Sequence, residues 1–212
     1  MRRMILALVV GGLWSVALGA QAGEMQDRLL EIQHQWAHIN YEMTDDDKKV
    51  DAFDELAAKA DQLAQDYPQQ AEPLAWKGII LSTEAGAAGG LSALGLVDDA
   101  RQAFEKSLAI NPDAAGGSAH TSLGSLYYQV PGWPISFGDD EKAEQQLKAG
   151  LAVDPQSIDG NYFYADYLKE QDQCDKAMTY FQKALDAPAR PERPLADKGR
   201  RKEIRAKMAE CE

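Results

Sequence analysis

The chain has 212 residues and a formal net charge of −12, from 34 acidic and 22 basic side chains. Its length suffices for one domain with a sizeable hydrophobic core. An acidic surface of this strength argues against nucleic acid and anionic membrane as partners, because both carry the same sign of charge.

Residues 1–22 are predicted to be a cleaved secretory signal peptide. Arg2 and Arg3 form a short positive start, residues 4–18 are almost wholly apolar, and the Ala-Gln-Ala sequence at 20–22 supplies the small residues of a cleavage site. The apolar run is too short for a comfortable membrane span, and a retained N-terminal anchor is the alternative interpretation. Because no cysteine follows the run, no lipid anchor is expected. We therefore expect a periplasmic protein without a stable membrane anchor after cleavage.

Residues 23–70 are predicted to form an N-terminal helix pair, a degenerate version of the repeat that follows. The first helix is expected to run from Glu24 to about Tyr41. The acidic run at 45–47 then caps a second helix, since carboxylates stabilise a helix N-terminus. This second helix is expected to end before Pro68.

Three segments within residues 71–190 end with the same pattern of side chains. In each segment a small residue is followed four positions later by a large apolar residue, so both lie on one helical stripe, and a proline ends the helix. The segments contain Ala100, Phe104 and Pro112, then Ala143, Leu147 and Pro155, then Ala177, Phe181 and Pro188.

Each of these helices is expected to pack against a helix that precedes it. Gly78, Gly124 and Ala165 lie among large apolar residues at helical spacing, so two antiparallel helices can approach closely there. Ala143 and Ala177 are 34 residues apart, which is the period of tetratricopeptide (TPR) repeats. The pattern therefore predicts an all-α fold, a TPR-type α-solenoid of antiparallel helix pairs.

Two segments, 84–96 and 129–140, are predicted to be inserted loops between the first and second helix of their units. Both must emerge at the same edge of the solenoid, where insertions commonly form binding loops. Trp133, which lies between two prolines, is expected to act with Phe137 as a lid that closes one end of a groove. The alternative is that both aromatic side chains pack onto the neighbouring repeat as satellite core.

The first helices of the units are expected to line a concave groove. The register set by the three small residues predicts a mostly polar inner face with two tyrosines. Such a face suits a polar or peptide-like ligand, and a solvated face without a specific ligand is the alternative. The expected groove residues are Ile79, Thr121, Ser125, Tyr128, Tyr162 and Asp166, with Trp133 and Phe137 as the lid.

Residues 191–212 are predicted to form a capping helix that covers the apolar edge of the stack. Because this helix should run antiparallel to the helix before it, its end returns towards Cys174. We therefore predict a Cys174–Cys211 disulfide in an oxidising compartment, with two free thiols as the alternative. The basic side chains of the helix are expected to be solvated or to face the acidic body; they are Arg200, Arg201, Lys202, Arg205 and Lys207.

Few residues suggest metal binding or catalysis. His34 and His38 share a helix face with Glu31, but nothing in the sequence completes a metal site, so a solvated or partly packed face is favoured. His120 is expected to be part of the core or of the groove wall. No nucleophile, base and orienting group can be recognised from spacing. We therefore predict no catalytic residue, no metal and no cofactor, and we do not expect an enzyme.

Several segments of the chain carry the features of one family. They are residues 119–127, 130–132 and 138–143, the Gly-rich insertion before Ala100, and a tail that contains Pro191, Arg193, Arg200 and Arg201. Together, over about residues 70–205, they resemble the T-component of bacterial TRAP transporters. The resemblance implies an all-α TPR fold with a cleft or pore for a ligand, and a periplasmic solute-binding protein as the partner. It also allows oligomers.

One departure from that family concerns its anchor. Members are often lipoproteins, whereas this chain has no acylatable cysteine at its N-terminus. The first hypothesis is therefore a periplasmic binding or adaptor module for a protein or a solute, as an accessory of a TRAP-type transporter. One alternative is a scaffold for cell-envelope assembly without a small-molecule ligand. The other is an enzyme, which would need an acid–base pair around His120 or Asp166.

Overall fold

The protein is mainly helical in the part of the chain that the structure, a computed structural model, describes: residues 13–211, with side chains from residue 23 onwards. The first twelve residues of the predicted signal peptide lie outside this part. None of the described helices is both long enough and apolar enough to span a membrane. The α-helices are α1 (Leu13–Glu42), α2 (Asp46–Asp66), α3 (Glu72–Ala88), α4 (Ala93–Ile110), α5 (Ser118–Gln129), α6 (Asp140–Val153), α7 (Ile158–Glu170), α8 (Cys174–Leu185) and α9 (Pro194–Ala209).

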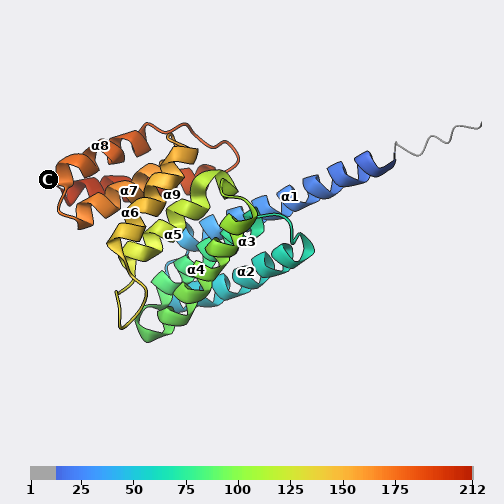
Figure 1. The fold of residues 1–212 in the computed structure, drawn as a ribbon, viewed down its shortest axis with the longest axis horizontal. Coiled ribbons are helices and arrows are strands. Elements are labelled where there is room, and N and C mark those ends of the chain that lie inside the picture. Colours follow the sequence, from blue (N-terminus) through green and yellow to red (C-terminus); the bar gives the residue numbers. More distant parts are fainter. Residues whose placement is uncertain (1–12, 212) are drawn as a thin grey trace, which may run out of the picture.

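Helix α1 starts before the point that the sequence pattern predicted. It begins at Leu13 rather than at Glu24, and Figure 1 shows its first part projecting from the body of the molecule. The predicted cleavage site at 20–22 is therefore inside a continuous helix. Alanine and glutamine in this stretch favour the helical backbone, and no proline interrupts it. Removal of the leader stays a prediction.

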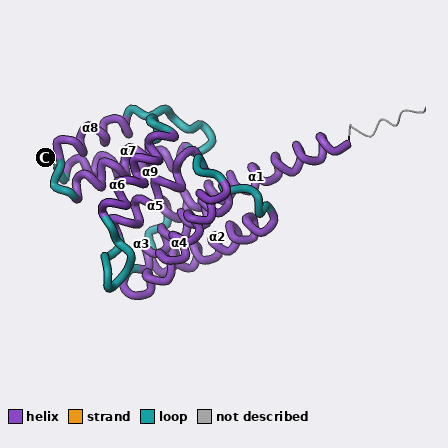
Figure 2. The backbone as a smooth tube through the Cα atoms, in the orientation of Figure 1, coloured by secondary structure: helices purple, strands orange, loops and turns teal. Residues whose placement is uncertain are grey.

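Eight helices form four antiparallel pairs. Helix α1 packs on α2, α3 on α4, α5 on α6 and α7 on α8, and short connections join the pairs into one stack (Figure 2). Local capping supports these boundaries, since the Asp45 side chain accepts the backbone N–H of Lys48 at 3.2 Å at the start of α2. The structure thus confirms the predicted all-α solenoid of helix pairs.

The small residues of the sequence pattern lie where the two helices of a pair touch. A Cβ placed on Gly78 would lie 2.6 Å from the ring of Phe104, and one on Gly124 would lie 3.0 Å from the backbone nitrogen of Leu147. Ala165 is fully buried in the α7 and α8 core. The absence of larger side chains therefore permits the close approach that packs each pair.

Adding one methyl group at the α5–α6 contact is expected to destabilise the protein. In Gly124→Ala the new Cβ meets backbone of α6, which cannot move without shifting the helix, so a loss of about 1–3 kcal/mol is expected. Gly86→Ala is the matched control, because no atom lies within 4 Å of its Cβ position and alanine favours helix. Urea unfolding measures both; equal midpoints for the two variants would contradict the packing argument.

The first predicted insertion is mostly helical, so its assignment as a loop was wrong. Residues 84–88 continue α3 and residues 93–96 begin α4, which leaves only 89–92 as the connection. Alanine and leucine, which favour helix, dominate this segment and extend both helices. The second insertion is a loop between α5 and α6, as predicted, and a single bridge joins Gly132 to Gly138 within it.

Helix α9 closes the concave side of the solenoid. It packs against α7 and α8 at one end of the stack and against α1 at the other. Gly199 lies against the ring of Tyr41, and the Tyr41 hydroxyl donates to Glu203 at 3.4 Å. Helices α1, α3, α5, α7 and α9 therefore follow one another in contact around one inner face. The predicted capping helix also joins the last repeat to the first.

A disulfide holds the end of the chain to the start of α8. Cys174 and Cys211 are bonded, with their Cα atoms 5.5 Å apart. This is the pairing that the antiparallel path of α8 and α9 predicts. The bond ties the segment after α9 to the last helix pair, so it also supports the closure of the inner face.

Candidate functional site

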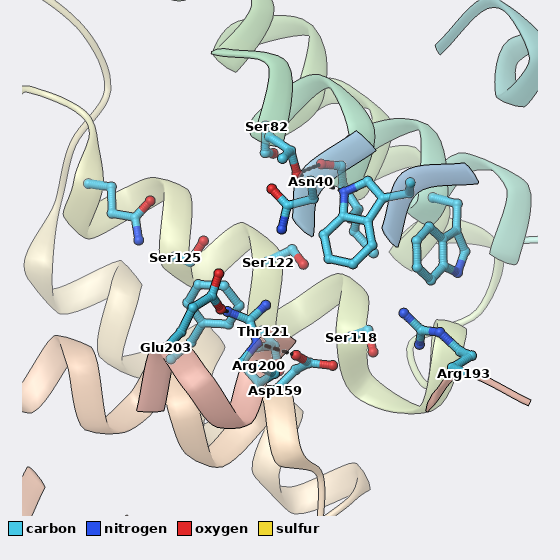
Figure 3. A pocket seen from close by; sticks show the side chains of 16 residues that line it. Asn40, Ser82, Ser118, Thr121, Ser122, Ser125, Asp159, Arg193, Arg200 and Glu203 are labelled. Atoms are coloured by element: carbon cyan, nitrogen blue, oxygen red, sulfur yellow. Dashed lines mark hydrogen bonds and ion pairs between the residues drawn. The ribbon is translucent and has the colours of Figure 1, made fainter. Parts of the chain in front are cut away.

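The inner face lines a partly open cavity of about 220 Å³ (Figure 3). Each of the five inner helices contributes side chains to its wall, so α9 completes a wall that α1, α3, α5 and α7 begin. Its size suits a small molecule rather than a folded partner. The lining residues are Trp36, Asn40, Trp76, Ile79, Ser82, Thr83, Ser118, Thr121, Ser122, Ser125, Gln129, Asp159, Phe163, Arg193, Arg200 and Glu203.

Hydroxyl groups line one wall of the cavity. Ser118, Thr121, Ser122 and Ser125 follow one another along α5, because positions three and four apart lie on the same helix face (Figure 3). Opposite them, on α3, the Ser82 hydroxyl donates to the Gly78 carbonyl at 2.7 Å. This wall can donate hydrogen bonds to a polar ligand.

Two tryptophans form an aromatic wall. The rings of Trp36 and Trp76 meet edge to face with centroids 5.9 Å apart, and both side chains are buried. The Trp36 indole N–H donates to the Thr83 hydroxyl at 3.0 Å, which fixes its orientation. A ligand in the cavity would therefore contact rigid apolar surface on this side.

Paired charges form the base of the cavity. The Arg200 guanidinium donates to Asp159 at 2.7 Å and to Glu203 at 2.6 Å. Arg190 donates to Asp159 at 2.7 Å and to Asp197 at 2.6 Å. Burial by itself would raise the pKa of Asp159, but Arg200 and Arg190 stabilise its carboxylate and hold the pKa well below its usual range. These groups are satisfied by one another.

Arg193 differs from the other arginines of this region. Its guanidinium lies over the Trp76 ring, 4.8 Å from the centroid, and it has no ion pair or side-chain hydrogen bond among the residues described. Burial, together with the nearby Arg190, lowers the pKa of Arg193 to about 10. The side chain therefore remains positively charged at neutral pH and faces the cavity without a partner.

The structure brings together some of the predicted groove residues and separates others. Ile79, Thr121 and Ser125 line the cavity. Tyr128, Tyr162 and Asp166 do not line it. Tyr128 donates to Asp166 at 2.9 Å, with the Lys207 ammonium 3.0 Å from the other oxygen of that carboxylate. Tyr162 packs under the Arg200 guanidinium, whose carbon is 4.4 Å from the ring centroid.

The two predicted lid residues point to different places. Trp133 is 90% exposed and does not line the cavity. Phe137 packs edge to face on Tyr127, with centroids 5.7 Å apart, and under Arg101. Phe137 therefore packs as satellite core, which was the alternative to a lid. Trp133 neither closes the cavity nor packs on the neighbouring repeat.

Sequence reasoning missed the residues that give the cavity its chemistry. The expected site residues do not include Trp36, Trp76 or Asp159. The sequence pattern marks Arg193 only as part of the tail that resembles the TRAP T-component, not as a site residue. Arg200 was expected to be solvated or to face the acidic body; it is buried between Asp159 and the Tyr162 ring, so the solvated alternative was wrong. The only local signal was the density of basic residues in α9.

The histidines have ordinary partners. His34 lies 2.5 Å from the Glu192 carbonyl oxygen, and His38 pairs with Glu42 one turn further along α1. His120 contacts the Gln146 side chain at 2.6 Å. Among the described residues, no group of three or more His, Cys, Asp or Glu side chains is arranged to hold a metal ion.

No protein-family model and no curated protein matches the sequence. Similar solved structures include TTC0263, a thermophilic TPR protein from Thermus thermophilus, which is 16% identical with a TM-score of 0.45 over 76% of this chain and 90% of that one. Yeast Tom70 is 15% identical with a TM-score of 0.49 over 76% of this chain and 31% of that one. MamA is 17% identical with a TM-score of 0.45 over 89% and 88%. These TM-scores are low, so the assignment of the fold rests on the antiparallel helix pairs of the structure itself.

Proposed function

We propose that this protein is a periplasmic TPR-type binding module that holds a small solute in its central cavity and presents one edge of the solenoid to a protein partner. The observation that carries the proposal is the closure of the inner face by α9, which turns a curved surface into a cavity with polar, aromatic and charged walls. Concave sites with walls of this kind bind small ligands through a few oriented polar groups.

The proposal is a binding function rather than catalysis. No serine or threonine that lines the cavity donates a hydrogen bond to a carboxylate or an imidazole among the described residues. The carboxylates of Asp159 and Glu203 are held by Arg200, so their charge is neutralised in place. A nucleophile would have no base beside it.

The finer proposal is that the module serves a TRAP-type solute transporter, with a periplasmic solute-binding protein as its partner. Two observations support it. The segments that resemble the T-component include the tail with Arg193 and Arg200, which line the central cavity, and the loop at 130–132, which contributes to an apolar pocket at one edge of the solenoid. In addition, the resemblance implies a ligand cleft or pore, and the chain forms a cavity.

Affinity purification from periplasmic extract tests the proposal. The chain is expressed with its own leader, and retained proteins and small molecules are identified by mass spectrometry, the latter under native conditions. A solute-binding protein and a small molecule in the purified complex are the expected result. Recovery of envelope-assembly proteins with no small molecule would instead favour the scaffold alternative, and conversion of an added substrate that is lost in His120→Ala would favour an enzyme.

An exposed apolar edge is the proposed surface for the protein partner. Leu91, Trp133 and Ile135 are 85%, 90% and 63% exposed, and they belong to the two connections that emerge at the same edge. Leu91 and Ile135 also line one shallow apolar depression there. Exposed apolar side chains that gather in one place are typical of interaction sites.

Truncating the tryptophan at this edge is expected to weaken partner capture. A central tryptophan that becomes buried in an interface often contributes about 2 kcal/mol, so Trp133→Ala should lower the affinity about thirtyfold. Ile110→Ala is the control, because Ile110 is also an exposed apolar residue but lies at the opposite end of α4. Biolayer interferometry with the purified partner measures both; unchanged binding by the tryptophan variant would assign the partner to another face.

A further inference from the structure

Arg193 lies at the wall of the central cavity and has no counter-ion among the described residues. Its Nε–H is buried and has no acceptor within the described part of the chain, and no carboxylate lies within ion-pair distance of the guanidinium. A buried donor is ordinarily hydrogen-bonded, and the outer nitrogens of this half-buried side chain are free of acceptors among the described residues. An acceptor from outside the chain would complete this site.

The neighbouring arginines do not share this property. Arg190 and Arg200 each make ion pairs with two carboxylates, and Arg201 lies 3.5 Å from Asp197. Together with Arg193, four arginines face the three carboxylates of Asp159, Asp197 and Glu203. The cluster therefore has one more positive than negative charge, although the whole chain is strongly acidic.

The surroundings of Arg193 suit the rest of an organic ligand. The Arg193 guanidinium lies over the Trp76 ring, and Figure 3 shows Arg193 near Ser118 at one end of the cavity, separate from the Arg200–Asp159 pair. The α5 hydroxyls continue the wall from Ser118 through Ser122, while Trp36 and Trp76 provide apolar surface. If the anionic group of a ligand bound Arg193, the hydroxylated or apolar remainder of the ligand would lie between these two walls.

From this arrangement we infer that Arg193 binds the carboxylate of a small hydroxylated organic acid in the central cavity, an inference that rests on the proposed solute-binding function. A guanidinium presents parallel N–H donors that match a carboxylate. A single unpaired cation balances one negative charge. A dianionic phosphate would bring excess negative charge close to Asp159 and Glu203, so a monocarboxylate is the better fit.

Calorimetric titration of the full chain purified from the periplasm tests the inference, with D-gluconate and L-lactate as probes. At least one of these acids is expected to bind with a Kd below about 10 mM, whereas neutral D-glucose and inorganic phosphate bind more weakly. Arg193→Gln should weaken acid binding at least about tenfold, and Arg193→Lys should weaken it less because the charge is kept. Arg205→Gln is the control, since this exposed arginine of α9 does not line the cavity.

Three results would overturn the inference: no binding of either acid, equal binding by wild type and Arg193→Gln, or tighter binding of phosphate than of the acids. Circular dichroism confirms that each variant keeps its helical fold. Native mass spectrometry distinguishes a failure of the Arg193 inference from a failure of the proposed solute-binding function. A neutral small molecule retained by the purified protein would contradict the anion site while supporting the cavity as a binding site. A cavity that retains no small molecule and binds no acid would contradict both.

Discussion

Asp159→Ala is expected to destabilise the folded protein by about 3–5 kcal/mol, the largest effect of any single substitution considered for this chain. The Asp159 carboxylate accepts from Arg190 and from Arg200, each at 2.7 Å. Its removal leaves two largely buried guanidinium groups short of negative charge next to the unpaired Arg193. Removing one member of a buried ion network costs more than the network itself contributes.

An exposed ion pair provides the control for this prediction. Asp98 also accepts from an arginine, Arg101, at 2.6 Å, but its side chain is 48% exposed. Surface pairs contribute about 0–1 kcal/mol, so Asp98→Ala should have a small effect. Urea unfolding at neutral pH measures both variants. If the two substitutions lowered the free energy of unfolding equally, the cluster beneath the cavity would have no special role in stability.

The same carboxylate should make the stability difference depend on pH. Arg200 and Arg190 hold the folded pKa of Asp159 below its value of about 3.9 in the unfolded chain. A lowered folded pKa means that the stabilisation is fully present above the unfolded pKa and is lost as the pH falls through the folded pKa. The wild type should therefore exceed Asp159→Ala in stability at pH 7, and the difference should shrink as the pH is lowered below about 4.

Removing the disulfide is expected to cost about 2–4 kcal/mol. Cys174 and Cys211 are separated by 37 residues, and closing a loop of this length restricts the unfolded chain substantially. In the double variant Cys174→Ser/Cys211→Ser, the segment after α9 is no longer tied to α8. Amides near the end of α9 should then exchange hydrogen faster, because this end would open locally more often.

Unfolding with and without a reductant tests the contribution of the disulfide. Thermal unfolding of the wild type should shift to lower temperature when the reductant dithiothreitol is added, and the double variant should unfold at the same temperature with or without it. An identical midpoint for oxidised wild type and double variant would show that the bond adds nothing to stability. In that case α9 would be held by its packing on α1 and α7 and by the ion pairs of Arg200 alone.

Local sequence patterns predicted the repeat units well, because the forces that form them act over short stretches of chain. Gly78 and Gly124 marked the helix contacts, since only a small residue permits such a close approach. Asp45 marked a helix start, since its carboxylate satisfies a free backbone N–H. The Cys174–Cys211 bond followed from the direction of two successive helices. The first insertion was misread because its glycines suggested a loop, whereas its alanines and leucines extend helices.

The sequence by itself determined the all-α stack, its helix pairs and the edge at which the second loop emerges. Only the tertiary structure decided that α9 meets α1 and that this contact completes a cavity between Trp36, Trp76 and Arg193. These residues are far apart in the chain, and their approach depends on the small rotation from each helix pair to the next, summed over four pairs. No local pattern encodes that sum, so the sequence left open whether the basic side chains of this helix are solvated or face the acidic body, and the structure places Arg200 in the second environment.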